Sequence, residues 1–145
     1  MRKLAAILVA GGVCVLGLAA FSLAAARSTV WTAALPSGQE VPKQVVRDVA
    51  AHGLFKGTLT GDKLHWRLTF ARLTGPATAA HIHMAARGKS GAVVVPLCGP
   101  CKSGVTGTAT ISAALRSAFT KHLLYVNVHT TKNPAGEIRG QLARG

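Results

Sequence analysis

Acidic side chains are scarce in this sequence. Its 145 residues include 17 lysines and arginines but only 4 aspartates and glutamates, so the formal net charge is +13. Mechanisms that need two cooperating carboxylates therefore have few candidates. The chain also lacks the G-x-G-x-x-G and G-x-S-x-G sequences of dinucleotide-binding enzymes and serine hydrolases. We therefore expect no enzymatic activity.

Aromatic residues are also few, at 5% of the chain. The basic residues are scattered at intervals of a few positions, without a block of five or six like charges. Nucleic-acid-binding surfaces combine clustered basic residues with aromatic side chains that stack on bases. We therefore expect no nucleic acid partner. An anionic polymer of the cell envelope, or another extracytoplasmic protein, is a better match to the positive charge.

The N-terminus has the pattern of an export signal. Two basic residues precede an uncharged run over residues 4–26, and this run ends in small residues that fit the rule for signal peptidase. We expect residues 1–26 to be a helical signal peptide and residues 27–145 to be the exported domain. Because the run is also long enough to cross a bilayer, an uncleaved membrane anchor is the alternative. The protein is then secreted, periplasmic or associated with the cell envelope.

The rest of the chain has the pattern of short β-strands. Leu64, Trp66, Leu68 and Phe70 alternate with polar residues, and the Gly-Asp pair at 61–62 is a hairpin turn signal. Glycine and proline interrupt the chain about every 8 to 12 residues, as in all-β sandwiches. The strands are predicted over residues 53–60, 64–70, 77–83, 92–97, 105–111, 123–130 and 137–142.

One helix is expected among these strands, over residues 112–121. Ser112 can cap its N-terminus, and Leu115, Ala118 and Phe119 share one helical face. No internal repeat or linker divides the exported part. The predicted fold is one antiparallel β-sandwich, immunoglobulin-like or superoxide-dismutase-like, with one short helix.

Two histidines at strand spacing are the most chemically specific feature. His81 and His83 project from one face of a strand, whereas Ile82 between them points into the core. In the strand over 123–130, Asn127 and His129 share the face opposite the valines. Three imidazoles can therefore meet, and imidazole binds both copper and zinc.

A metal site of His81, His83 and His129 is thus one hypothesis. In it, Arg139 supplies nearby positive charge, and Asn127 or Glu137 supplies hydrogen bonds that orient the ligands. The other hypothesis is that the histidines bond to loop backbone and hold the strand ends. It includes a buried or half-buried charge pair of Glu137 with Arg139 that ties the last strand to the sheet. The other three histidines, at 52, 65 and 122, have no such partners, and we expect them at the surface.

The sequence Cys98-Gly99-Pro100-Cys101 has the spacing of a thioredoxin-type redox centre. That chemistry needs a helix after the first cysteine, and residues 102–107 are poor helix formers. In an exported chain, two cysteines this close more often form a small-loop disulfide. Redox activity and metal ligation are the alternatives.

Four sequence blocks, in order, resemble the CHRD domain, a family named after chordin. The similarity extends over about residues 31–143 and implies an exported β-sandwich with a binding or structural role. Three of the blocks also resemble, more distantly, the copper/zinc superoxide dismutases, although the bridging histidine and zinc loop of those enzymes are lacking. The four blocks are 35–42 (LPSGQEVP), 78–83 (TAAHIH), 125–130 (YVNVHT) and 133–142 (NPAGEIRGQL).

Overall fold

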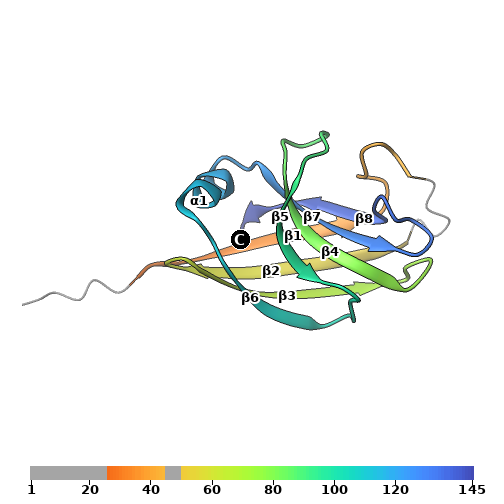
Figure 1. Ribbon diagram of the computed structural model, residues 1–145, viewed down its shortest axis with the longest axis horizontal. Helices are drawn as coiled ribbons and strands as arrows, with labels where there is room; N and C mark the ends of the chain where they lie inside the picture. The colour runs from red at the N-terminus through yellow and green to blue at the C-terminus, as the bar shows by residue number, and fades with distance from the viewer. Residues whose placement is uncertain (1–25, 45–49) are drawn as a thin grey trace, which may run out of the picture.

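Two antiparallel β-sheets pack face to face in the computed structural model, which describes residues 26–44 and 50–145 (Figure 1). The first sheet has the strand order β6-β3-β2-β1-β9 and the second β5-β4-β7-β8. The predicted all-β sandwich with one short helix is confirmed. The strands are β1 (Ser28–Pro36), β2 (His52–Thr60), β3 (Lys63–Ala71), β4 (Ala77–Met84), β5 (Val93–Cys98), β6 (Val105–Thr110), β7 (Leu124–Thr130), β8 (Ile138–Gln141) and β9 (Ala143–Arg144).

The predicted signal peptide lies outside the described residues, except for its last residue. Within the part of the chain that is described, no helix is long and apolar enough to cross a membrane.

Seven strands, β2 to β8, match predicted strands to within two residues at each end, but β1 and β9 were not predicted. Trp31, Ala33 and Leu35 alternate along β1 and are buried. Alanine is a weak strand former, and β1 follows directly after the predicted signal. Antiparallel pairing with β2 over nine residue pairs establishes this strand.

The β2–β3 hairpin turns at the predicted Gly-Asp pair. Gly61 has a φ of 60°, a left-handed conformation that favours glycine. On the neighbouring strand β6, a Cβ atom at Gly107 would lie 2.4 Å from the Trp66 ring. A side chain at residue 107 would therefore displace a core tryptophan.

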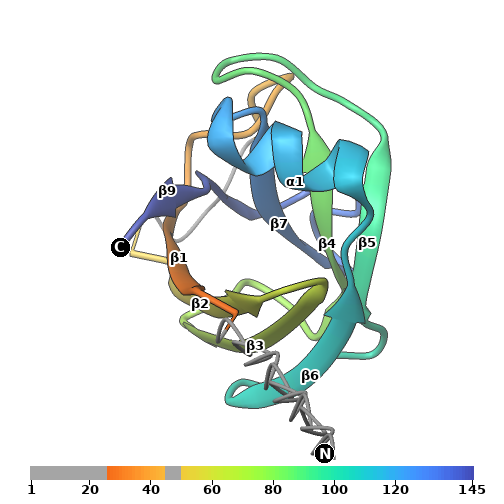
Figure 2. The ribbon, with the colours of Figure 1, turned by 90° about the vertical axis from the view of Figure 1, so that its left-hand side faces the viewer.

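The helix α1 (Ala113–Thr120) closes one end of the sandwich (Figure 2). The Ser112 hydroxyl accepts a hydrogen bond from the backbone N–H of Leu115 at 3.1 Å, as expected of an N-cap. Leu115, Ala118 and Phe119 are buried, and the Phe119 ring centre lies 5.0 Å from that of Trp31. The helix, its cap and its buried face are as predicted.

The cysteine pair forms the predicted disulfide between Cys98 and Cys101. Cys98 is paired with Ala80 of β4, and the backbone N–H of Cys101 donates to the Ala77 carbonyl at 3.1 Å. The disulfide loop is therefore fastened to the strand that carries His81 and His83.

The outer face of the second sheet is covered by loops. Ile82, Val126 and Val128 point into the core and are fully buried, as the period of two requires. Tyr125 and Asn127 point outward, yet they are only 2% and 3% exposed. The segments over residues 37–44 and 85–92 supply this cover, since Glu40 contacts Asn127 and Gly91 contacts Tyr125.

Candidate metal centre

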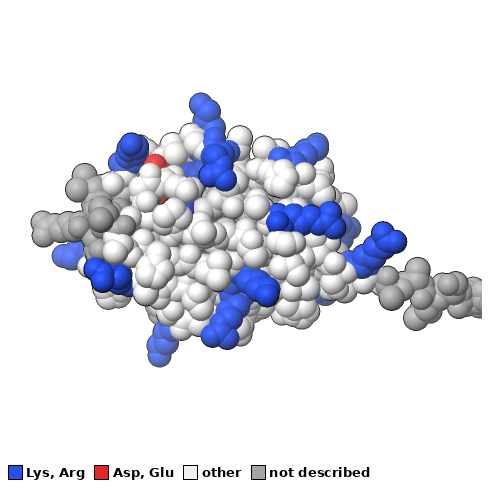
Figure 3. Space-filling model, turned by 180° about the vertical axis from the view of Figure 1, so that it is seen from behind, with Lys and Arg blue, Asp and Glu red and all other residues white. Residues whose placement is uncertain are grey.

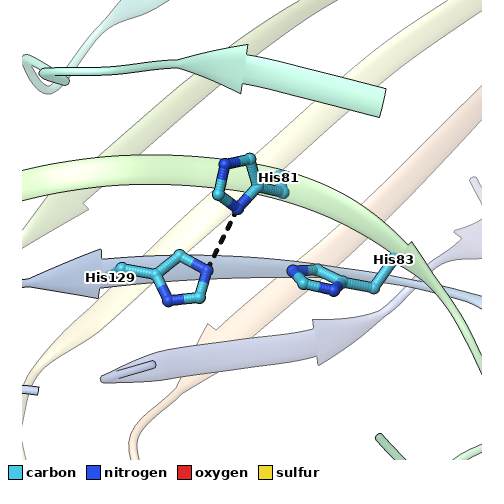
Figure 4. A group of neighbouring side chains, drawn as sticks. All are labelled: His81, His83 and His129. Carbon is cyan, nitrogen blue, oxygen red and sulfur yellow. Dashed lines mark hydrogen bonds between the residues drawn. The ribbon is translucent and has the colours of Figure 1, made fainter. Parts of the chain in front are cut away.

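Three histidines converge on the outer face of the second sheet (Figure 4). One ring nitrogen from each of His81, His83 and His129 lies within 4.8 Å of the other two. β4 carries His81 and His83, and the adjacent strand β7 carries His129. The convergence of the three histidines that we expected from the alternation of side chains along the two strands is therefore present.

His83 and His129 lean toward each other along the strands. In the pairing of β4 with β7, His83 lies opposite Tyr125 and His129 lies opposite Ala79. These two cross-strand pairs are four residues apart along β4, a distance of about 13 Å. The centres of the two imidazole rings are nevertheless only 5.9 Å apart. Both rings therefore extend over the cross-strand pair that lies between them, which is His81 with Asn127.

Backbone carbonyls select the protonated nitrogen of two of the rings. The Nδ1 atoms of His83 and His129 lie 3.0 Å from the carbonyl oxygens of Gly91 and Pro134, respectively. A carbonyl can only accept, so each Nδ1 carries a proton and each Nε2 carries a lone pair. Within the described residues, Nε2 of His83 is buried without a hydrogen-bond partner. Both rings thus present a metal-ligating nitrogen.

The third ring faces one of these lone pairs. Nδ1 of His81 lies 3.2 Å from Nε2 of His129 and donates to it while no metal is bound. Ligation through Nδ1 would require the proton of this ring to move to Nε2, which gives the other neutral tautomer. The ligand set that the geometry offers is therefore Nδ1 of His81 together with Nε2 of His83 and of His129.

All three imidazoles are in surroundings that disfavour their charged form. Burial lowers the pKa of each ring below its ordinary value, and repulsion from the other two rings lowers that of His81 further. The hydrogen bonds to the Gly91 and Pro134 carbonyls act in the opposite direction but do not reverse the shift. The rings are neutral at pH 7, which metal ligation requires.

The spacing of the nitrogens is close to that of a metal site. Bonds of about 2.1 Å in a tetrahedral zinc site separate two ligand nitrogens by about 3.4 Å. The 3.2 Å between His81 and His129 already meets this requirement. The widest separation, 4.8 Å, must shorten by about 1.4 Å when an ion binds.

Tyr125 links this group to Arg139. The Tyr125 ring stacks on the His83 ring with centres 4.9 Å apart and planes at 7°. The guanidinium carbon of Arg139 lies 3.4 Å from the centre of the Tyr125 ring, and Arg139 also donates to the Lys89 carbonyl. Arg139 therefore supplies the positive charge expected near the histidines, and this charge contributes to the lowered pKa of His83.

Glu40 and Asn127 form a buried polar pair beside the histidines, and no role for Glu40 is evident from the sequence. Nδ2 of Asn127 donates to Oε2 of Glu40 at 3.1 Å. Gly136 permits this approach, because a Cβ atom there would lie 2.5 Å from Oε2 of Glu40. Burial raises the pKa of Glu40 to about 7, although the Arg139 charge and the Asn127 hydrogen bond lower it.

The predicted charge pair of Glu137 with Arg139 is wrong, because these two described side chains do not contact each other. The Glu137 carboxylate accepts four hydrogen bonds, two from Thr74 at 2.6 and 2.7 Å, one from Thr130 at 2.6 Å and one from Asn133 at 3.0 Å. Three of these donors reach Oε2 and one reaches Oε1, and Arg139 is turned toward Tyr125 instead. Glu137 therefore belongs to a network that joins the segment between β3 and β4 to the end of β7 and to the residue before β8.

The histidines and the basic residues outside this site are dispersed. The three other histidines, His52, His65 and His122, are exposed, as predicted. Lysine and arginine side chains are spread over the face in Figure 3 without forming one patch.

A model of the CHRD domain family matches residues 31–142. The matched range contains the three histidines, Glu40 and Asn127. No curated protein and no solved structure matches the chain.

Proposed function

Because the chain belongs to the CHRD domain family, we propose that it is a binding module without catalytic activity and that it binds a copper or zinc ion through His81, His83 and His129. The observation that supports this proposal is the convergence of one neutral nitrogen from each ring to within 4.8 Å. Neutral imidazole is a ligand for both ions.

A purely structural role does not account for all of the hydrogen bonds. Nδ1 of His83 and of His129 does hold loop backbone, as the structural hypothesis expects. That role leaves Nε2 of His83 buried and unpartnered in the described part of the chain, at a cost of about 1–3 kcal/mol. A bound metal ion would satisfy this lone pair. The carbonyl bonds would then orient the ligands.

We also propose that the protein is exported. The Cys98–Cys101 disulfide is compatible with an oxidising compartment. Residues 1–26 would act as a signal peptide or, alternatively, as a membrane anchor. An anionic envelope polymer or another extracytoplasmic protein would be the macromolecular partner.

Calorimetric titration with Cu²⁺ and Zn²⁺ tests the metal proposal. The purified protein is expected to bind one ion, and His81→Ala/His83→Ala to bind it at least about 100-fold more weakly because two ligands are lost. His65→Ala/His122→Ala is the matched control, since it removes two exposed histidines, and it should bind like the wild type. His129→Gln serves as a second ligand variant.

Two results would contradict the proposal. One is a wild-type protein that takes up no stoichiometric metal. The other is equal uptake by the ligand variants and by the control, with all of them folded by circular dichroism.

A further inference from the structure

Unsatisfied polar atoms gather beside the three histidines. In the described part of the chain, four buried side-chain nitrogen or oxygen atoms have no hydrogen-bond partner. Nε1 of Trp31 is one of them. The other three are Nε2 of His83, Oδ1 of Asn127 and Oε1 of Glu40. Buried polar atoms without partners are rare in folded proteins, so a group of three indicates a bound species.

The backbone register places Asn127 at the centre of this group. Asn127 is paired with His81 on β4 and lies between Tyr125 and His129 on the outer face of β7. The His83 and His129 rings lean toward each other over this cross-strand pair. The Asn127 side chain therefore lies on the sheet surface between the imidazoles.

Glu40 is hydrogen-bonded to Asn127 at the same place on the sheet. Its Oε2 atom accepts the hydrogen bond from Asn127, and its other oxygen, Oε1, has no partner. The Arg139 charge acts on both Glu40 and His83, so both groups lie within electrostatic range of one guanidinium. A surface pocket of 410 Å³ is lined by Glu40 together with Arg87 and Gly88. This pocket brings solvent close to the Glu40–Asn127 pair.

A metal ion alone does not satisfy these atoms. The ion would use the lone pair of His83, but Asn127 Oδ1 and, above the Glu40 pKa of about 7, the ionised Oε1 of Glu40 are acceptors and need two protons. A water molecule supplies two protons and one lone pair for a metal. A hydroxide has one proton, and direct ligation by Asn127 would leave Glu40 Oε1 unpartnered.

We propose that a water molecule occupies the fourth coordination position, bound to the metal through its oxygen and donating its two protons to Asn127 Oδ1 and Glu40 Oε1. This inference rests on the proposed metal site. Three protein ligands and one water are the arrangement of open zinc sites, whereas structural sites are closed by four protein ligands. The metal would therefore keep one position that a small external ligand can take.

Pulsed electron paramagnetic resonance of the Cu²⁺-loaded protein, in H₂O and in D₂O, tests this inference. The wild type is expected to show three imidazole nitrogen couplings and the strong exchangeable proton couplings of one bound water. In Glu40→Gln the nitrogen couplings should persist and the water proton couplings should change. Azide, detected by its charge-transfer band, should bind about tenfold more tightly, because the water it displaces has lost a charge-assisted hydrogen bond.

Asp62→Asn is the matched control, because it removes an exposed carboxylate at the β2–β3 turn. It should leave both the couplings and the azide affinity unchanged. A wild-type spectrum with nitrogen couplings but no strongly coupled exchangeable protons would overturn the water ligand and leave the metal site intact. Identical results for Glu40→Gln and Asp62→Asn would do the same. A wild type that takes up no copper would instead refute the metal site itself.

Discussion

Replacing Glu137 by glutamine is expected to lower the free energy of unfolding by about 3 kcal/mol. The Glu137 carboxylate is fully buried and accepts hydrogen bonds from Thr74, Thr130 and Asn133. Glutamine replaces one acceptor oxygen with an NH₂ group that faces these donors, so buried donors lose their partner. Urea unfolding at pH 7, followed by tryptophan fluorescence, measures the change.

The sign of the pH dependence follows from the same contacts. Burial acts to raise the pKa of Glu137, but the hydrogen bonds from Thr130, Thr74 and Asn133 outweigh it and lower the pKa below the ordinary 4.5. The stabilisation is therefore present above pH 4.5 and is lost as the pH falls through the folded-state pKa. Glu137→Gln should lack this acid-dependent loss.

Asp62→Asn is the control for Glu137→Gln. Its carboxylate forms an exposed ion pair with Lys63 at 3.4 Å, and such pairs contribute at most about 1 kcal/mol. A Glu137→Gln variant as stable as Asp62→Asn would refute the structural role assigned to Glu137.

Replacing Glu40 by glutamine is expected to change how stability depends on pH. The folded-state pKa of about 7 lies above the ordinary 4.5, so the folded protein holds this proton more tightly than the unfolded chain. The resulting stabilisation is fully present below pH 4.5 and is lost as the pH rises through 7. Between pH 5 and pH 8 the wild type should therefore lose about 2.5 kcal/mol from this group.

Urea unfolding of metal-free wild type and Glu40→Gln at pH 5 and pH 8 tests this prediction. The variant lacks the titrating group, so its stability relative to the wild type should rise by about 2.5 kcal/mol between the two pH values. Contributions from the histidines are common to both proteins and cancel in the comparison. A difference that is the same at pH 5 and pH 8 would show that Glu40 does not titrate as described.

The convergence of the histidines was predictable because period-two alternation determines which side chains share a face. His81 and His83 flank the core residue Ile82, and His129 follows the core residue Val128. The pairing of β4 with β7 was not determined by this pattern. It was needed as an additional assumption, since β5, β6 and α1 lie between them in the chain.

Contacts made by loops could not be derived in the same way. Glu40 meets Asn127 across 87 residues of sequence, and no periodicity connects them. Glu137 bonds to Thr74 across 63 residues, and for this reason the nearby Arg139 was mistaken for its partner. The position of Glu40 in the first of the four sequence blocks, residues 35–42, was the one signal that could have pointed to it.

The most direct test of the metal site is a long-range ¹H–¹⁵N spectrum of the six histidine rings before and after one equivalent of Zn²⁺. Only the nitrogen signals of His81, His83 and His129 are expected to shift. Their ligating nitrogens should be Nδ1 of His81 and Nε2 of the other two. Shifts confined to His52, His65 or His122, or no shift at all, would contradict the proposed metal site.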